Sequence, residues 1–192
     1  MKLLRSLFIL VSASLLFSSC GYNGMVEKRE AVDQSWAQVQ NVYQRRADLI
    51  PNLVNTVKGA ANFEKETLTE VINARAKATS IQLNANDLTP EKLQQFEAAQ
   101  SQLSGALSRL MVTVEKYPDL KANANFQTLQ GQLEGTENRI TVERMKFNTS
   151  VQDYNTFIKR FPNNLTSGMF GFDKKAYFQA DPASQKAPTV TF

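Results

Sequence analysis

Between residues 125 and 161 the chain repeats a mostly hydrophobic position every three or four residues, without a break. This spacing places the residues on one stripe of an α-helix, because side chains in a strand repeat every two residues. At about 1.5 Å per residue, such a helix reaches roughly 50 Å. We therefore expect the rest of the chain to supply helices that cover the stripe. The stripe consists of Leu129, Leu133, Thr136, Ile140, Arg144, Phe147, Val151, Tyr154, Ile158 and Phe161.

A second stripe of the same kind contains a proline, Pro51. A proline inside a helix deletes one backbone hydrogen bond and costs about 3 kcal/mol. The phase of the stripe is nevertheless the same on both sides, which favours one long helix kinked near residues 47–51. The alternative is two helices that meet at Pro51, as the first residue of the second. The stripe consists of Val32, Trp36, Val39, Tyr43, Arg46, Ile50, Leu53, Val57 and Ala60.

Two further stripes lie between these, over residues 68–78 and 93–117. Asn62, Thr89 and Asn125 are candidate N-caps of the helices that follow them, and Pro90 and Pro118 mark a start and a stop. The sequence thus predicts an all-α fold, an elongated antiparallel bundle of four long helices. The stripe residues are Leu68, Val71, Arg75 and Ala78, then Leu93, Phe96, Gln100, Leu103, Leu107, Leu110, Val114 and Tyr117.

After Phe161, the sequence Pro-Asn-Asn is expected to stop the last helix. Residues 169–178 then carry four aromatic side chains, which we expect to fold back on one end of the bundle. Residues 179–192 have no periodicity and are expected to form a disordered tail.

Residues 1–19 have the features of a lipoprotein-type signal peptide. Lys2 and Arg5 precede an apolar run at residues 7–17, which as a helix would rise about 16 Å, against a hydrocarbon core of roughly 30 Å. Residues 17–20, Phe-Ser-Ser-Cys, resemble the lipobox of bacterial lipoproteins, although Phe17 and Ser19 depart from its commonest residues. The resemblance implies that Cys20 becomes the N-terminus and carries acyl chains such as palmitate. The alternative is an uncleaved signal anchor with a free thiol.

Composition removes several classes of function. The net charge of +4 falls to +2 without Lys2 and Arg5, and no basic run remains, so we expect no nucleic-acid partner. The chain has no histidine and a single cysteine, Cys20. These counts exclude histidine-dependent triads and zinc sites built from histidine or cysteine. We expect no metal, no cofactor and no catalytic residues.

Several motifs together resemble the LemA family, and they cover nearly all of the chain after the leader. The longest is Tyr-Gln-Arg-Arg-Ala-Asp-Leu-Ile-Pro-Asn-Leu-Val at residues 43–54; others are Tyr-Pro-Asp-Leu-Lys-Ala-Asn at 117–123, Phe147-Asn148, Tyr154-Asn155 and Phe-Gly-Phe at 170–172. The resemblance implies a membrane-anchored bundle of antiparallel helices outside the cytoplasm, without an established enzymatic activity.

A polar residue interrupts each stripe. The arginines Arg46, Arg75 and Arg144 occupy apolar positions, and Gln100 holds the equivalent place in its stripe. An unpaired buried guanidinium is costly, so inward-facing arginines must meet carboxylates such as Glu97, Glu137 or Glu143. They could form a polar layer that fixes helix register, or lie at the edge of the stripe with their heads in solvent. The third possibility is an anion or peptide-carboxylate site.

The predicted organisation is a signal peptide at 1–19, a lipid-attachment cysteine and flexible tether at 20–24, a bundle with an aromatic segment at 25–178, and the tail. We expect a non-enzymatic scaffold or adaptor of the bacterial envelope. It would be held by its N-terminal lipid to the cell membrane or outer membrane, facing the periplasm or the outside, with another envelope protein as partner. The alternative is a bundle that binds a small ligand or lipid.

Overall fold

A computed structural model describes the backbone of residues 2–60 and 63–179, and the side chains of these residues except 2–20 and 86. Every regular element in this part of the chain is helical, so the predicted all-α class is confirmed. Four of the α-helices are long. The elements are α1 (Lys2–Lys58), α2 (Lys65–Ser80), η1 (Ala85–Asp87), α3 (Pro90–Val114), α4 (Pro118–Lys121), α5 (Ala124–Lys159), η2 (Asn163–Leu165) and η3 (Gly168–Phe170).

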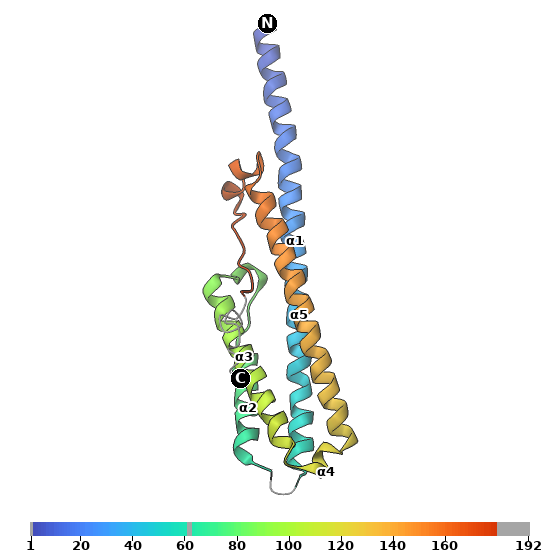
Figure 1. Ribbon diagram of the computed structural model, residues 1–192. Helices are drawn as coiled ribbons and strands as arrows, with labels where there is room; N and C mark the ends of the chain where they lie inside the picture. The colour runs from blue at the N-terminus through green and yellow to red at the C-terminus, as the bar shows by residue number, and fades with distance from the viewer. Residues whose placement is uncertain (1, 61–62, 180–192) are drawn as a thin grey trace, which may run out of the picture.

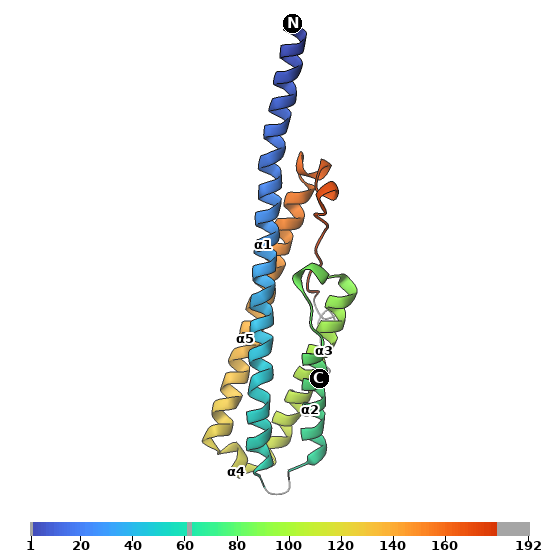
Figure 2. The ribbon, with the colours of Figure 1, turned by 180° about the vertical axis from the view of Figure 1, so that it is seen from behind.

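The long helices lie alongside one another and form a rod (Figure 1). Successive long helices run in opposite directions, and α1 and α5 lie side by side over the whole length of α5 in both views (Figures 1 and 2). The α2–α3 pair covers the half of α1 that is distant from the N-terminus. At the other end, α1 extends beyond the rest of the molecule (Figure 1).

The core consists of two hydrophobic clusters, one in each half of the rod. The cluster nearer the N-terminus is centred on Trp36, whose ring lies 5.5 Å from that of Phe147 and 5.6 Å from that of Phe96. The Trp36 indole Nε1 donates a hydrogen bond of 3.0 Å to the Leu83 carbonyl, so its polar atom is satisfied. The second cluster joins α1, α2, α3, α4 and α5 around residues such as Leu53 and Leu110.

α1 passes through Pro51 without ending, so the structure contains one helix here rather than two. Pro51 has no N–H to bond the carbonyl four residues earlier, which belongs to Ala47. The Arg75 Nε of α2 donates a hydrogen bond of 2.8 Å to that carbonyl. A side chain from the neighbouring helix therefore satisfies the acceptor that the proline leaves free. The kink at Pro51 stays a prediction.

The helix starts agree with the sequence at one position and differ at another. Thr89 caps α3 as predicted, because its hydroxyl accepts a hydrogen bond from the Lys92 N–H. Asn123, not Asn125, caps α5: its Oδ1 accepts from the N–H groups of Asn125 and Phe126. The helix starts two residues earlier than predicted, which buries Phe126 in the second cluster. The predicted cap Asn62 lies outside the described residues.

Residues 21–24 continue α1 instead of forming a flexible tether. The physical reason is close packing: a Cβ placed on Gly24 would lie 2.5 Å from Phe157 Cζ, and one on Gly21 would lie 2.6 Å from Asn163 Oδ1. Glycine at these two positions lets Phe157 and Asn163 lie against α1 without a shift of their side chains.

The aromatic segment after α5 folds back only in part. Phe172 and Phe178 are buried in the first cluster, whereas Met169, Phe170 and Tyr177 are exposed. Phe161, expected to be the last stripe residue, is 80 % exposed because α5 ends at Lys159 and takes it off the stripe. The predicted tail lies outside the described residues, apart from Gln179.

Two asparagines of α5 hold the extended segment that follows residue 171. The Asn155 side chain forms hydrogen bonds with both the N–H and the carbonyl of Lys175, at 3.0 and 2.9 Å. Asn148 does the same for Phe178, at 2.9 and 3.0 Å. These asparagines are one heptad apart, so they lie on one face of α5 and fix the register of the segment along it.

Candidate functional site

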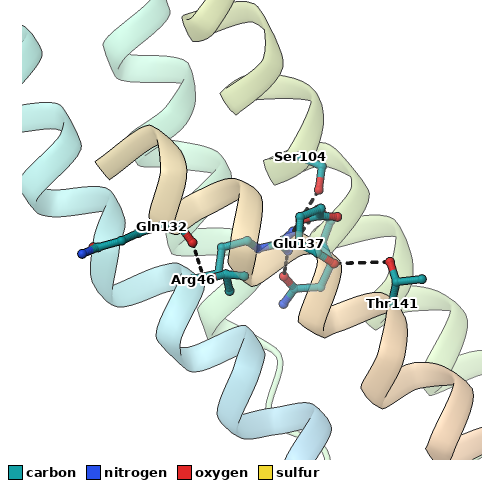
Figure 3. Close-up of polar contacts among 7 residues, drawn as sticks. Arg46, Ser104, Gln132, Glu137 and Thr141 are labelled. Atoms are coloured by element: carbon teal, nitrogen blue, oxygen red, sulfur yellow. Dashed lines mark hydrogen bonds and ion pairs between the residues drawn. The ribbon is translucent and has the colours of Figure 1, made fainter. Parts of the chain in front are cut away.

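Two of the polar stripe residues, Arg46 and Gln100, lie at the level where the two hydrophobic clusters meet. Arg46 of α1 is 2 % exposed and lies between Tyr43 of the first cluster and Ile50 of the second. Its Nη1 donates to Glu137 Oε2 of α5 at 2.8 Å and to Ser104 Oγ of α3 at 2.9 Å (Figure 3). The guanidinium of Arg46 therefore connects its own helix, α1, to both α3 and α5.

Gln100 is a further partner of Arg46, whose Nε is buried without a hydrogen bond to any described residue. Its Oε1 accepts a hydrogen bond from Arg46 Nη2, and its Nε2 donates one of 3.2 Å to the Ala78 carbonyl of α2. The structure thus brings Arg46 and Gln100 into direct contact. Arg75 lies outside this contact and binds the Ala47 carbonyl instead.

Arg144 forms a second charged group, about two turns beyond Glu137 along α5. It pairs with Glu97 of α3, and its guanidinium carbon lies 4.6 Å from the centre of the Phe178 ring. It also donates a hydrogen bond of 3.3 Å to the Gln179 carbonyl. Glu143, a third carboxylate expected near the arginines, pairs with Lys146 of its own helix.

Both charged groups line one cleft of about 510 Å³ between α3 and α5, with α1 as its floor. The backbones of α3 and α5 approach less closely than those of α1 and α5. The lining is mainly polar, with Gln94, Ser101 and Thr141 at the surface. Each arginine of the cleft has a carboxylate partner. The cleft therefore offers a neutral hydrogen-bonding surface and no free cation for an anion.

No pattern in the sequence marks Ser104 as a partner of Arg46, or a second ionic pair that is partly buried. Lys175 Nζ lies 4.0 Å from Asp33 Oδ1 and donates a hydrogen bond of 2.6 Å to the Ala85 carbonyl. Burial raises the pKa of Asp33, partly offset by the Lys175 charge. Burial likewise lowers the pKa of Lys175, with Asp33 acting against it. No periodicity marks Lys175, because it lies in an extended segment.

Within the part of the chain that the structure describes, no three side chains of the metal-binding types gather at one place. No helix there is long and apolar enough to cross a membrane. The side chain of Cys20, the predicted lipid-attachment site, lies outside the described residues. Its acylation, and the absence of a metal or cofactor, stay predictions.

The fold and the site define a class: an elongated protein of long helices, with charged pairs joining three of them at mid-height. A family model described as the LemA family matches residues 35–192. The chain belongs to the LemA family, as its motifs indicated.

Relatives of known name are similar over most of the chain. It is 24 % identical to the magnetosome protein MamQ 2 of Paramagnetospirillum magneticum, over 88 % of this chain and 68 % of that protein. The magnetosome protein MamQ of Magnetospirillum gryphiswaldense gives the same identity and coverage. It is also 24 % identical to protein LemA of Metamycoplasma hominis, over 90 % of this chain and 76 % of that protein.

Proposed function

We propose that this protein is a non-enzymatic scaffold of the bacterial cell envelope, tethered to a membrane at its N-terminus and presenting its bundle to another envelope protein. Its working form would be an elongated antiparallel bundle of four long helices, with α1 bent at Pro51. Membership of the LemA family and similarity to MamQ support association with a membrane. The tether would be the lipid on Cys20, and the bundle would face the periplasm or the outside.

The pairing of charges in the α3–α5 cleft is the observation that carries this proposal. A catalytic centre or an anion site needs a group free to act, whereas Arg46 and Arg144 are each held by a carboxylate. The whole sequence has no histidine, and its only cysteine is Cys20, the proposed lipid-attachment residue. A cleft lined mainly by polar side chains suits the polar surface of a folded partner, where complementary polar groups set specificity.

A bundle that binds an apolar ligand would need an apolar cavity along the Trp36–Val57 part of α1. The apolar stripe residues of that part are buried in the two hydrophobic clusters. The α3–α5 cleft is lined mainly by polar side chains. We therefore favour the scaffold over the alternative of a small-ligand or lipid-binding protein.

Site-specific crosslinking in living cells tests the proposal. A photoreactive benzoylphenylalanine replaces Ser101 or Thr141, which are exposed at the cleft, and Val112, which is exposed elsewhere on α3, serves as the matched control. The scaffold predicts one defined protein adduct from both cleft positions and none from Val112. Adducts only with lipid, or the same adducts from all three positions, would contradict it.

A further inference from the structure

The end of the rod nearest the leader has a cluster of exposed apolar side chains. Met169 is 83 % exposed and Leu165 is 63 % exposed, and Phe161 and Phe170 are also largely in solvent. We call these four residues the apolar tip. Exposed aromatic and long apolar side chains within the one segment 161–170 indicate a surface that a membrane or another molecule covers.

Packing against α1 fixes the height of the apolar tip along the rod. The Phe170 ring lies 5.3 Å from that of Tyr22. Asn163 comes within 2.6 Å of the position where a Cβ of Gly21 would be. Figure 1 shows the same arrangement: the segment after α5 lies beside α1 where α1 extends toward the N-terminus. Since a helix rises about 1.5 Å per residue, Tyr22 lies only about 3 Å along the axis from Cys20.

From this geometry we infer that the apolar tip inserts into the lipid interface as a second membrane contact. The inference rests on the proposed membrane tether, because an acylated Cys20 or an embedded leader would both bring residue 20 to the bilayer surface. The tip would then reach that surface without any change in the fold. Aromatic side chains are favoured at this depth, where their rings contact both headgroups and acyl chains.

The charge around the tip also fits a lipid surface. The segment 159–174 carries the cations Lys159, Arg160 and Lys174 against one carboxylate, Asp173. Cations beside inserted apolar residues are attracted to anionic headgroups. A second contact would orient the rod relative to the membrane, which a single flexible lipid anchor does not do.

Lipid-depth quenching tests the inference on the full-length protein, reconstituted in vesicles of phosphatidylethanolamine and phosphatidylglycerol that contain doxyl-labelled lipid. An NBD fluorophore is attached to Met169→Cys at the tip. The control is the same label on Val112→Cys, an exposed position near the far end of the rod. The unsubstituted chain corrects for labelling of Cys20. We expect strong quenching at 169 and none at 112. In a chain labelled at Leu165→Cys, Met169→Glu should reduce the quenching by roughly half, and Val112→Glu should not.

The outcomes separate the two proposals. If the protein floats with the vesicles but the label at 169 is quenched no more than that at 112, the tether stands and the lipid contact of the tip is wrong. If the protein does not float with the vesicles, both are wrong. If the label at 169 is shielded only in native membranes, the tip contacts a protein, which also overturns the inference.

Discussion

Arg75 supplies the hydrogen bond that Pro51 cannot make. Its Nε donates to the carbonyl of Ala47, the residue four positions before Pro51, at 2.8 Å. A buried carbonyl without a partner costs about 1–3 kcal/mol. Arg75 of α2 thus compensates for the hydrogen bond that Pro51 removes from α1, and this explains how α1 continues through the proline.

Replacing Arg75 should therefore matter only as long as Pro51 is present. We expect Arg75→Leu to lower the free energy of unfolding by about 1–2 kcal/mol, because the Ala47 carbonyl loses its donor. In a Pro51→Ala background, the new N–H can bond that carbonyl, so the cost of Arg75→Leu should shrink to within about 0.5 kcal/mol. Urea unfolding of the four variants measures the coupling. Lys77→Leu, on the exposed side of α2, is the control, and equal costs in both backgrounds would contradict the prediction.

Glu137→Ala should destabilise the fold through Arg46. The Glu137 side chain is 53 % exposed, whereas Arg46 is buried, so the substitution leaves a buried cation with only neutral acceptors. Removing one partner of a fully buried pair costs about 3–5 kcal/mol, and solvent at Glu137 reduces this to about 1–3 kcal/mol. Thermal or urea unfolding measures the loss.

Glu134→Ala provides the control for Glu137→Ala. Glu134 lies on the exposed face of α5, where it accepts a hydrogen bond from Gln130. Its replacement should change the free energy of unfolding by no more than about 0.5 kcal/mol. If Glu137→Ala were equally mild, or raised the melting temperature while abolishing partner crosslinking at the cleft, Arg46 would serve a binding site and not the fold.

The sequence predicted most of the helices because their stripes are long and regular, and Val32, Trp36, Val39, Ile50 and Leu53 are all buried as expected. It also identified Arg46, Gln100 and Glu137 as polar residues that could meet. Their actual pairing could not be predicted, because which helix faces which is set by tertiary packing. Thus Arg75 interrupts its stripe just as Arg46 does, but it donates a hydrogen bond to the Ala47 carbonyl and does not line the cleft.

The errors lie where local signals compete or are missing. Asn123 and Asn125 are both good N-caps, and the choice depends on the burial of Phe126. Glycines at 21 and 24 are typical of a flexible segment, but they can equally mark a close helix contact. The extended segment near Lys175 has no periodicity, and backbone hydrogen bonds to Asn148 and Asn155 determine its position.

Alkaline pH should weaken the fold through Tyr43. Burial raises the pKa of Tyr43 above its usual 10.0, although the charges of Arg144 and Arg46 act in the opposite direction. Above pH 10 the unfolded chain therefore releases the phenolic proton while the folded chain keeps it. The folded state binds more protons there, so the free energy of unfolding falls as the pH rises from 10.0 through the folded-state pKa.

Tyr43→Phe should remove part of this pH dependence. The measurement is the urea midpoint of the wild type and the variant at neutral pH and again above pH 10, where the difference between them should shift in favour of the variant. Tyr154, whose pKa burial also raises, keeps part of the dependence in the variant. Tyr177→Phe, the same substitution at an exposed position, is the control. A midpoint difference between wild type and Tyr43→Phe that is constant with pH would contradict the prediction.

Gly24 distinguishes a helix packed against α5 from a flexible tether. A side chain at this position would collide with Phe157, since even a Cβ lies 2.5 Å from the tip of its ring. We expect Gly24→Leu to lower the free energy of unfolding by about 1–3 kcal/mol, because the added side chain forces α1 and α5 apart. Denaturant unfolding of the chain gives the value.

Gly105 is the matched control for Gly24, because it also lies within a helix but nothing lies within 4 Å of a Cβ added there. Gly105→Ala should raise the free energy of unfolding by about 0.5–1 kcal/mol, the ordinary gain in helix propensity. Gly24→Ala has the same intrinsic gain, and the contact with Phe157 should cancel or reverse it. If both alanine variants gained equally, residues 21–24 would not pack against α5, and the apolar tip would lose the contact that sets its height beside the leader.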